Sequence, residues 1–161
     1  MDQVPLIDRM SVMMRGAVTS STICLADLDN DGEFELGLGS SAGHLSVFKG
    51  VQEECVRRQT RLGHIVALAA GDVFNRQKNV LVVITADGNC RIFDWDKIPP
   101  TENVKDEEEN DDTSSSTLNS NGKPANPAPW PPCFHQRLPP NVKQAQIRDV
   151  NGDGLNELVV M

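Results

Sequence analysis

The sequence contains no tyrosine, and aromatic residues make up only 4% of its 161 residues. A core built from this chain must therefore rely on valine, leucine, isoleucine and alanine. The sequence also has no apolar stretch close to the roughly 18 residues that a membrane-spanning helix needs. We accordingly expect a domain with a small aliphatic core and no direct membrane insertion.

Closely spaced cysteines are missing as well. The four cysteines lie far apart, at Cys24, Cys55, Cys90 and Cys133, so no C-x-x-C pair supports a zinc site or thioredoxin-type chemistry. The acidic segment 1–5 is not followed by the apolar region of a signal peptide, and no N-x-[ST] sequon occurs. These features favour a cytoplasmic protein with reduced thiols.

An excess of positive charge is also absent. The formal net charge is −8, which argues against nucleic acid and against an anionic membrane surface as the main partner. The charge is uneven, because an acidic run at residues 105–112 supplies much of it. The rest of the chain is only mildly acidic.

Internal repetition is the most informative positive signal. A short apolar run leads to each of three aspartates, Asp27, Asp72 and Asp149. Each aspartate begins a loop, and an apolar strand is expected after each loop, at residues 36–39, 80–84 and 158–161. In the first two units, a Gly turn and a further strand that ends in Phe follow.

The second spacing of the repeat contains an insert. Asp27 and Asp72 are 45 residues apart, whereas Asp72 and Asp149 are 77 apart. Residues 99–132 consist mostly of Pro, acidic residues, Ser, Thr and Asn. Such a segment cannot bury enough apolar area to offset its ordering entropy, so we expect it to be disordered. Its Pro-rich end, with Trp130, is either a spacer or a polyproline II docking segment.

A period near 45 residues with several short strands is typical of β-propeller blades, which makes the expected fold class all-β. We assign two blades to residues 10–98, the acidic insert to 99–132 and the start of a third blade to 133–161. Propellers close with roughly four to eight blades, so we expect an incomplete ring from a longer protein. A WD-type blade, with Gly63-His64 and Trp95-Asp96, is a weaker alternative.

The loop at residues 27–35 reads D-x-D-x-D-G-x-x-E, with a glycine that permits a sharp turn. Side chains at alternate positions can turn toward one centre, and roughly six or seven oxygen ligands suit Ca²⁺ better than Mg²⁺. The predicted ligands are the side chains of Asp27, Asp29, Asp31 and Glu35 and the backbone carbonyl of Glu33. In the loop at residues 149–157 they are Asp149, Asn151, Asp153 and Glu157, with the carbonyl of Leu155.

The loop after Asp72 does not keep these ligands. It has Phe74 and Arg76 where the acids would stand, so we expect it to be free of metal, with Arg76 replacing the charge of the ion. An EF-hand is rejected for the other two loops because the acid comes at loop position 9 rather than 12 and strands follow. A hydrogen-bonded Asp/Gly turn without an ion is the alternative there.

Signs of catalysis are missing too. His44, His64 and His135 are isolated in the sequence, and no nucleophile motif accompanies them. We expect a protein that is not an enzyme. An enzyme carried on a propeller is the alternative with the least support.

The succession of strand, D-x-D-x-D-G-x-x-[DE] loop and strand on this period resembles the integrin-α FG-GAP repeat family. The residues that carry the resemblance are 23–31, 71–75 with 78–82, and 149–154 with 157–160. The match covers most of residues 10–98 and 133–161 but not the acidic insert.

Among the intracellular FG-GAP proteins, the chain is similar to those that take part in the KICSTOR complex. This resemblance implies a non-enzymatic scaffold whose partners are the other KICSTOR subunits and GATOR1. It also implies recruitment to the lysosome and restraint of mTORC1 when amino acids or glucose are scarce. The alternative is an integrin-like, calcium-dependent adhesion propeller outside the cell, which the missing sequons and signal peptide disfavour.

Overall fold

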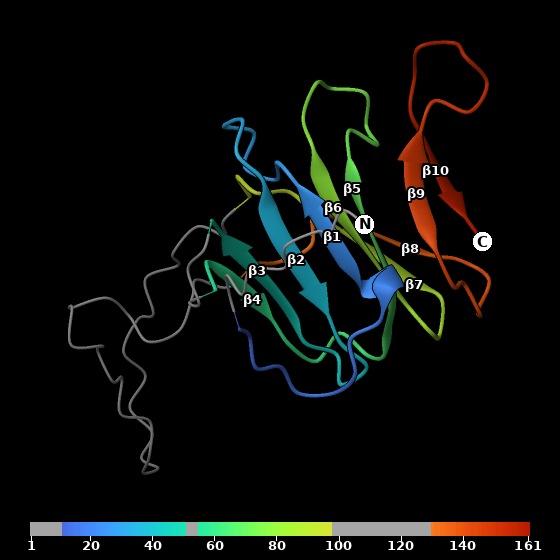
Figure 1. The fold of residues 1–161 in the computed structure, drawn as a ribbon. Coiled ribbons are helices and arrows are strands. Elements are labelled where there is room, and N and C mark those ends of the chain that lie inside the picture. Colours follow the sequence, from blue (N-terminus) through green and yellow to red (C-terminus); the bar gives the residue numbers. More distant parts are fainter. Residues whose placement is uncertain (1–10, 51–54, 98–129) are drawn as a thin grey trace, which may run out of the picture.

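The structure is a computed structural model that describes residues 11–50, 55–97 and 130–161, which form three antiparallel sheets (Figure 1). The first sheet follows a single 3-10 turn, η1 (Ser20–Thr22), and has the order β1-β2-β3-β4. Its strands are β1 (Ile23–Ala26), β2 (Glu35–Gly39), β3 (Leu45–Lys49) and β4 (Arg57–Gln59).

The second sheet has the order β5-β6-β7-β8, and the third consists of β9 and β10. The strands are β5 (Ile65–Gly71), β6 (Val80–Thr85), β7 (Asn89–Phe93), β8 (Phe134–Arg137), β9 (Ala145–Arg148) and β10 (Glu157–Val160). No helix among the described residues is long and apolar enough to cross a membrane.

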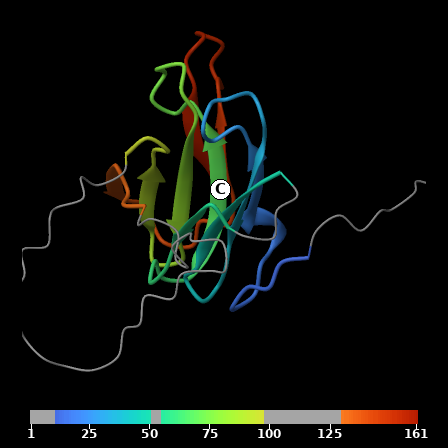
Figure 2. The same cartoon turned by 90° about the vertical axis from the view of Figure 1, so that its left-hand side faces the viewer.

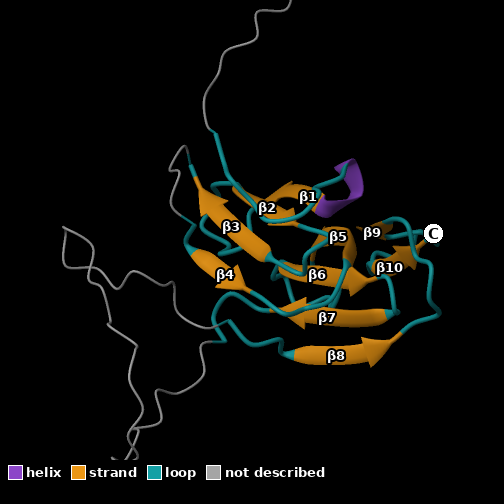
Figure 3. Ribbon diagram, turned by 90° about the horizontal axis from the view of Figure 1, so that it is seen from below, coloured by secondary structure: helices purple, strands orange, loops and turns teal. Residues whose placement is uncertain are grey.

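The all-β fold class is confirmed, and the sheets follow the sequence repeat. In each unit, the strand before the Asp loop pairs with the strand after it: β1 with β2, β5 with β6, and β9 with β10. β5 packs against both β1 and β9, so the first strands of the three units are neighbours (Figure 3). The outer strands β4 and β8 lie at the opposite edges of their sheets.

The strand β6 explains why the second sheet is apolar on both faces. Every β6 residue is buried, and successive side chains of a strand point to opposite faces. Leu81 and Val83 belong to the core shared with the first sheet. Val80, Val82 and Ile84 belong to the core shared with the third sheet. The three sheets are therefore held together by two cores, one on each side of the second sheet.

The fourth strand of the second sheet comes from beyond the insert. β8 pairs with β7, with Phe134 opposite Ile92 and Arg137 opposite Asn89. Residues 134–137, which the sequence assigns to a third blade, are thus part of the second sheet, and the third unit begins at β9. The insert interrupts a blade rather than separating two blades. Most of its predicted disorder falls outside the described residues.

Trp130 lies within the predicted insert, yet its side chain is in the core and only 1% exposed. Its ring centre lies 5.1 Å from that of Phe93 and 5.8 Å from that of Trp95. Its Nε1–H donates to the carbonyl of Asp94 at 2.8 Å. The guanidinium of Arg57, from β4 of the first sheet, lies 4.6 Å from the centre of the Trp95 ring. Trp130 is therefore a core residue and not a spacer or a docking residue.

Candidate functional site

The three Asp loops lie along one end of the molecule in chain order (Figures 1 and 2). We call residues 27–35 the first loop, 72–80 the second loop and 149–157 the third loop. Positions within each loop are numbered from 1, the aspartate, to 9. The loops connect β1 to β2, β5 to β6 and β9 to β10.

The loops share a backbone conformation although their side chains differ. Positions 4 and 6 have positive φ angles in all three loops. They are Asn30 (62°) and Gly32 (94°), Asn75 (56°) and Gln77 (58°), and Gly152 (79°) and Gly154 (85°). Glycine adopts this left-handed region freely and asparagine more readily than other residues. Because the second loop has the same shape without acids at positions 3 and 5, those acids do not determine the shape.

The aspartate at position 1 stabilises each loop from inside. In the first and second loops its carboxylate accepts backbone N–H groups from positions 5 and 6. In the third loop it accepts those of positions 4 and 6, and the N···O distances across the three loops are 2.6–3.1 Å. Such side-chain to backbone bonds are typical of Asx turns. The loops are hydrogen-bonded turns in their own right.

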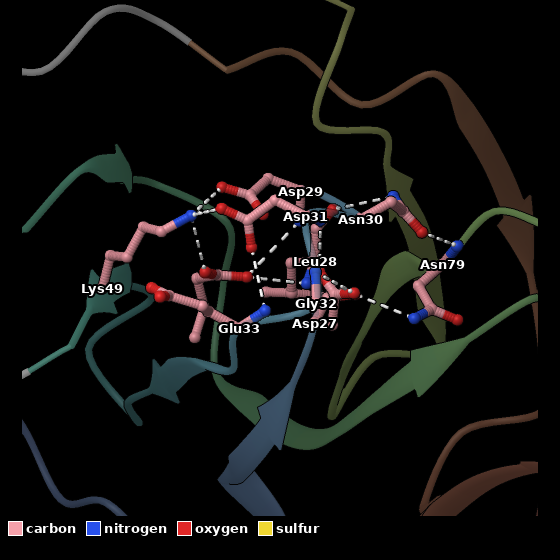
Figure 4. Close-up of polar contacts among 10 residues, drawn as sticks. Asp27, Leu28, Asp29, Asn30, Asp31, Gly32, Glu33, Lys49 and Asn79 are labelled. Atoms are coloured by element: carbon pink, nitrogen blue, oxygen red, sulfur yellow. Dashed lines mark hydrogen bonds and ion pairs between the residues drawn. The ribbon is translucent and has the colours of Figure 1, made fainter.

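The carboxylates of the first loop gather around Lys49, the last residue of β3 (Figure 4). Lys49 Nζ lies 2.5 Å from Asp29 Oδ2 and 3.4 Å from Glu35 Oε1. It also donates a hydrogen bond to Asp31 Oδ2. Three of the four predicted side-chain ligands for Ca²⁺ thus contact one ammonium group.

The remaining predicted ligands of the first loop lie beside this cluster. Asp27 has a carboxylate oxygen within 4.8 Å of oxygens of Asp29 and Glu35. Glu33 has an exposed side chain, and its N–H donates to Asp31 Oδ1 at 2.9 Å. The loop therefore brings its predicted side-chain ligands together, but around an ammonium.

Burial makes the charge of Lys49 important. Glu35 is 0% exposed, and its Oε2 accepts the Leu28 N–H at 2.7 Å. Its Oε1 and Asp29 Oδ1 are buried and accept no hydrogen bond from any described residue. A buried carboxylate without a compensating charge is strongly destabilising. The hydrogen bonds to Asp29 and Asp31 raise the pKa of Lys49, and the hydrogen bond from Lys49 lowers the pKa of Asp31.

The second blade has the opposite arrangement of charges. Lys78, at position 7 of the second loop, lies 2.7 Å from a carboxylate oxygen of both Asp94 and Asp96. Asp94 follows Phe93 as Lys49 follows Phe48, so the two occupy the same place in successive blades. The hydrogen bonds to Asp94 and Asp96 raise the pKa of Lys78. The loop supplies the cation here, and the end of the third strand supplies the anion.

Arg76 does not have the role that the sequence suggested. Its guanidinium carbon lies 5.3 Å from the centre of the Phe74 ring, in a cation–π contact within the second loop. The expectation that Arg76 replaces the charge of the ion is therefore wrong, because Lys78 forms the ion pairs of this loop.

The third loop has the predicted spacing without an ammonium. Asp149, Asp153 and Glu157 each place a carboxylate oxygen within 4.8 Å of the others. The ion pairs of the described residues involve only Lys49 and Lys78 as cations, and neither contacts this loop. These oxygen donors fit Ca²⁺. Those of the first loop fit it poorly, because the Lys49 ammonium already contacts three of their four acidic side chains.

Hydrogen bonds donated by asparagines connect successive loops. Asn79, at position 8 of the second loop, donates its backbone N–H to Asn30 Oδ1 and its side-chain amide to the carbonyl of Asp27, both at 2.8 Å. Asn156, at position 8 of the third loop, makes the same two contacts with positions 4 and 1 of the second loop, at 2.7 and 3.2 Å. We call this pattern the asparagine clasp. Our sequence analysis missed it, although the repeated Asn at positions 4 and 8 was its signal.

A shallow cavity lies where the first strands of the three units meet. The residues that line it include Cys24, Ala26, Ala70, Ala145 and Ile147. Burial raises the pKa of the Cys24 thiol to about 11, so this thiol stays protonated at neutral pH. Because the thiolate is the nucleophile, Cys24 is not activated for catalysis.

A family model settles the relationship of the chain to known proteins. The model described as integrin-alpha FG-GAP repeat-containing protein 2 matches residues 49–161, which include the second and third loops. The chain belongs to this family. The matched residues contain the second and third units of strand, Asp loop and strand described above.

Curated members of the family match nearly the whole chain. The KICSTOR complex protein ITFG2 of Mus musculus is 32% identical over 162 residues, which cover 99% of this chain and 32% of that protein. Its namesake from Bos taurus is 31% identical and is matched over 99% of this chain and 27% of its own length. The chain thus spans about a third of the length of these relatives.

Solved structures show a similar fold. Two crystal structures of BBS1N in complex with ARL6DN, soaked with mercury or with lead, have TM-scores of 0.52 and 0.51. Both are 18% identical to this chain and cover 90% of it, and the chain covers 34% and 37% of them. At this identity the likeness concerns the fold alone.

Proposed function

We propose that this chain is part of a non-enzymatic FG-GAP propeller that serves as a scaffold in a complex of the KICSTOR type. The observation that carries the proposal is the name of the mouse and bovine relatives, KICSTOR complex protein ITFG2, at about 32% identity over 99% of the chain. A protein named for its complex is expected to work through its surfaces.

The local chemistry supports a scaffold. Lys49 and Lys78 neutralise carboxylates within their own blades. The asparagine clasp and the cores on both faces of the second sheet connect neighbouring blades. The polar groups of the Asp loops are thus used for structure. A rigid ring of blades offers broad surfaces to protein partners.

The expected partners are the other KICSTOR subunits and GATOR1. In this proposal the complex anchors GATOR1 at the lysosome and restrains mTORC1 when amino acids or glucose are scarce. The relatives' names support membership in a complex of the KICSTOR type. The roles of GATOR1, the lysosome and mTORC1 are what the FG-GAP resemblance implies.

Affinity purification of the full-length protein tests the proposal. We expect the other KICSTOR subunits and GATOR1 to be recovered with the wild type and with Glu33→Gln, which changes only an exposed side chain. Leu81→Asp places a charge at a 0% exposed core position and is expected to abolish recovery. Recovery of only extracellular or matrix proteins would overturn the proposal and favour integrin-like adhesion.

A cellular experiment tests the regulatory part. In cells that lack the protein, we expect mTORC1 to stay active during amino-acid starvation, and re-expression of the wild type to restore inhibition. The Leu81→Asp variant should not restore it. Normal inhibition in the cells that lack the protein would contradict the regulatory role.

We also propose a structural Ca²⁺ in the third loop. Its ligands are Asp149, Asn151, Asp153 and Glu157, with the carbonyl of Leu155. Millimolar Ca²⁺ is expected to raise the Tm of the full-length protein, and the double change Asp149→Asn, Asp153→Asn to reduce this shift. If the double change leaves the shift unaltered, the third loop is a hydrogen-bonded turn without an ion.

A further inference from the structure

The first loop contains the carboxylates of a calcium site together with a side chain that already neutralises them. Lys49 reaches Asp29, Asp31 and the buried Glu35 from the end of β3 (Figure 4). We propose that the ammonium group of Lys49 takes the place of the metal ion in the first loop and makes this loop independent of calcium.

Two oxygens strengthen the assignment. Glu35 Oε1 and Asp29 Oδ1 are buried and accept no hydrogen bond from the described residues. Their charge must be compensated by a cation, because a buried unpaired carboxylate is costly. Lys49 Nζ, 3.4 Å from Glu35 Oε1 and 2.5 Å from Asp29 Oδ2, is the cation in contact with both side chains. Its ammonium meets the same requirement that a divalent ion would meet.

The second blade supports the same interpretation independently. Its loop has lost the acids at positions 3 and 5, and the residue in the place of Lys49 is an anion, Asp94. The cation is now Lys78, which comes from the loop itself. In both blades, a lysine and an aspartate join the Asp loop to the end of the third strand. The lysine and the aspartate have exchanged places between the two blades, but an ion pair between loop and strand is present in both.

A divalent ion and the Lys49 ammonium exclude one another at this site. Both would lie at contact distance from the same carboxylates, which include the fully buried Glu35, and like charges a few ångströms apart repel one another. For Ca²⁺ to enter, Lys49 would have to leave Asp29 and Asp31. The wild-type first loop is therefore a poor calcium site despite its complete set of acids.

Removal of the ammonium should convert the loop into a calcium site. The experiment uses the full-length protein with Lys49→Met and, as a milder change, Lys49→Gln. In EDTA, both variants are expected to melt at lower temperature than the wild type. In millimolar Ca²⁺ their Tm should return toward the wild-type value. Calorimetric titration should detect one Ca²⁺ more per chain, bound roughly 100-fold or more tightly than at the wild-type first loop, as expected from the lost repulsion.

The second blade provides a matched control. Lys78→Met also removes an ammonium from an Asp loop, but Phe74 and Arg76 stand at the positions of the missing acids. This variant is expected to lose stability without gaining a calcium ion. Adding Asp29→Asn and Asp31→Asn to Lys49→Met should abolish the gained ion. Asp149→Asn and Asp153→Asn affect only the third loop, so the two calcium proposals are separated.

Two results would overturn the inference. One is a wild-type protein that loses a bound Ca²⁺ when Asp29 and Asp31 are changed to Asn, because Lys49 would then not exclude the ion. The other is that Lys49→Met and Lys49→Gln bind no additional Ca²⁺, whether they fold or fail to fold in its presence. Folding of a Lys49 variant only when Ca²⁺ is added counts as support. The test does not depend on the protein partners.

Discussion

Lys49 and Asp94 stand at the same place in successive blades and carry opposite charges. In each blade the Asp loop supplies the opposite charge. Asp29 and Asp31 pair with Lys49 in the first blade, and Lys78 pairs with Asp94 in the second. A single side chain thus decides whether a loop with the calcium-type pattern needs an ion. Counting the acids in the motif does not show whether the loop needs an ion, because the neutralising Lys49 comes two strands and a turn later in the sequence.

The first prediction concerns the pH dependence of the Lys49 cluster. The pKa of Asp31 is lowered in the folded state, so its contribution to stability is present above the unfolded value of about 4 and is lost as pH falls through the folded pKa. The pKa of Lys49 is raised, so its contribution is present below about 10.4 and is lost as pH rises through the folded pKa. Lys49→Gln should therefore lower the Tm most between about pH 5 and 10.

Thermal melts of the wild type and Lys49→Gln across pH measure this difference. It should shrink as the pH falls below about 4 and through the lowered pKa of Asp31. A Tm difference that stays constant down to about pH 2 would show that the effect of the substitution is not electrostatic.

The second prediction concerns the close contact between Gly37 and Cys24, which are opposite one another in β2 and β1. A Cβ added at Gly37 would lie 2.6 Å from Cys24 Sγ. Gly37→Ala should cost about 1–3 kcal/mol in the free energy of unfolding, since overpacking forces neighbouring groups to shift. Cys24→Ala removes the sulfur, so the double variant should recover most of the loss. Urea denaturation of both single variants and the double variant measures the coupling, and purely additive losses would contradict the clash.

At the scale of elements, the three Asp loops are joined in one direction. The second and third loops each present position 8 to positions 4 and 1 of the loop before them, through Asn79 and Asn156. The first loop has Phe34 at position 8, which is 62% exposed, and the third loop has Gly152 at position 4. An asparagine at position 4 therefore has two roles. Its left-handed backbone helps to shape its own loop, and its side-chain oxygen accepts a hydrogen bond from position 8 of the next loop.

The third prediction tests the asparagine clasp. Asn79→Ala removes the side-chain hydrogen bond to the carbonyl of Asp27 and should cost about 1 kcal/mol in the free energy of unfolding. Phe34→Ala changes the equivalent position of the first loop, which forms no clasp with the described residues, and should cost less than about 0.5 kcal/mol. Equal losses in the two variants would argue that position 8 has no special role between the blades.

At the scale of the molecule, the described residues form three sheets around two cores. The chain leaves the second sheet after β7 and returns to the same sheet at β8. The chain returns at Trp130, which contacts Trp95 beyond the end of β7. β8 then completes the sheet. The contact between these two rings places the ends of the insert close together.

The fourth prediction follows from this closure. Replacement of residues 100–128 by a Gly/Ser linker of about six residues should leave the Tm within a few degrees, because loop length changes stability only weakly. Trp130→Ala, by contrast, removes a fully buried ring and should cost about 3–5 kcal/mol in the free energy of unfolding. Differential scanning calorimetry of both variants measures the contrast. A linker variant as unstable as Trp130→Ala would mean that the insert itself contributes to the fold.

The inner strands of the blades could be predicted from the sequence, because they contain apolar residues in a repeated order and are bounded by Asp and Gly turns. The outer strands could not. β4 is Arg-Arg-Gln and β8 is Phe-His-Gln-Arg, with side chains mostly exposed at the sheet edge. Polar edge strands have no periodic apolar signal, since their pairing is set by backbone hydrogen bonds to the neighbouring strand. Trp130 was missed for a related reason, because its proline-rich surroundings conceal a core residue.

The sequence alone determined the repeat, the all-β class and the positions of the three Asp loops, since these depend on local patterns of apolar residues, Asp and Gly. Only the tertiary structure decided what the loops do. The approach of Lys49 to the carboxylates of the first loop, the exchanged ion pair of Lys78 and the clasp between loops all join residues from different strands or blades. Charge neutralisation depends on distances in space, and those distances exist only once the sheets are packed.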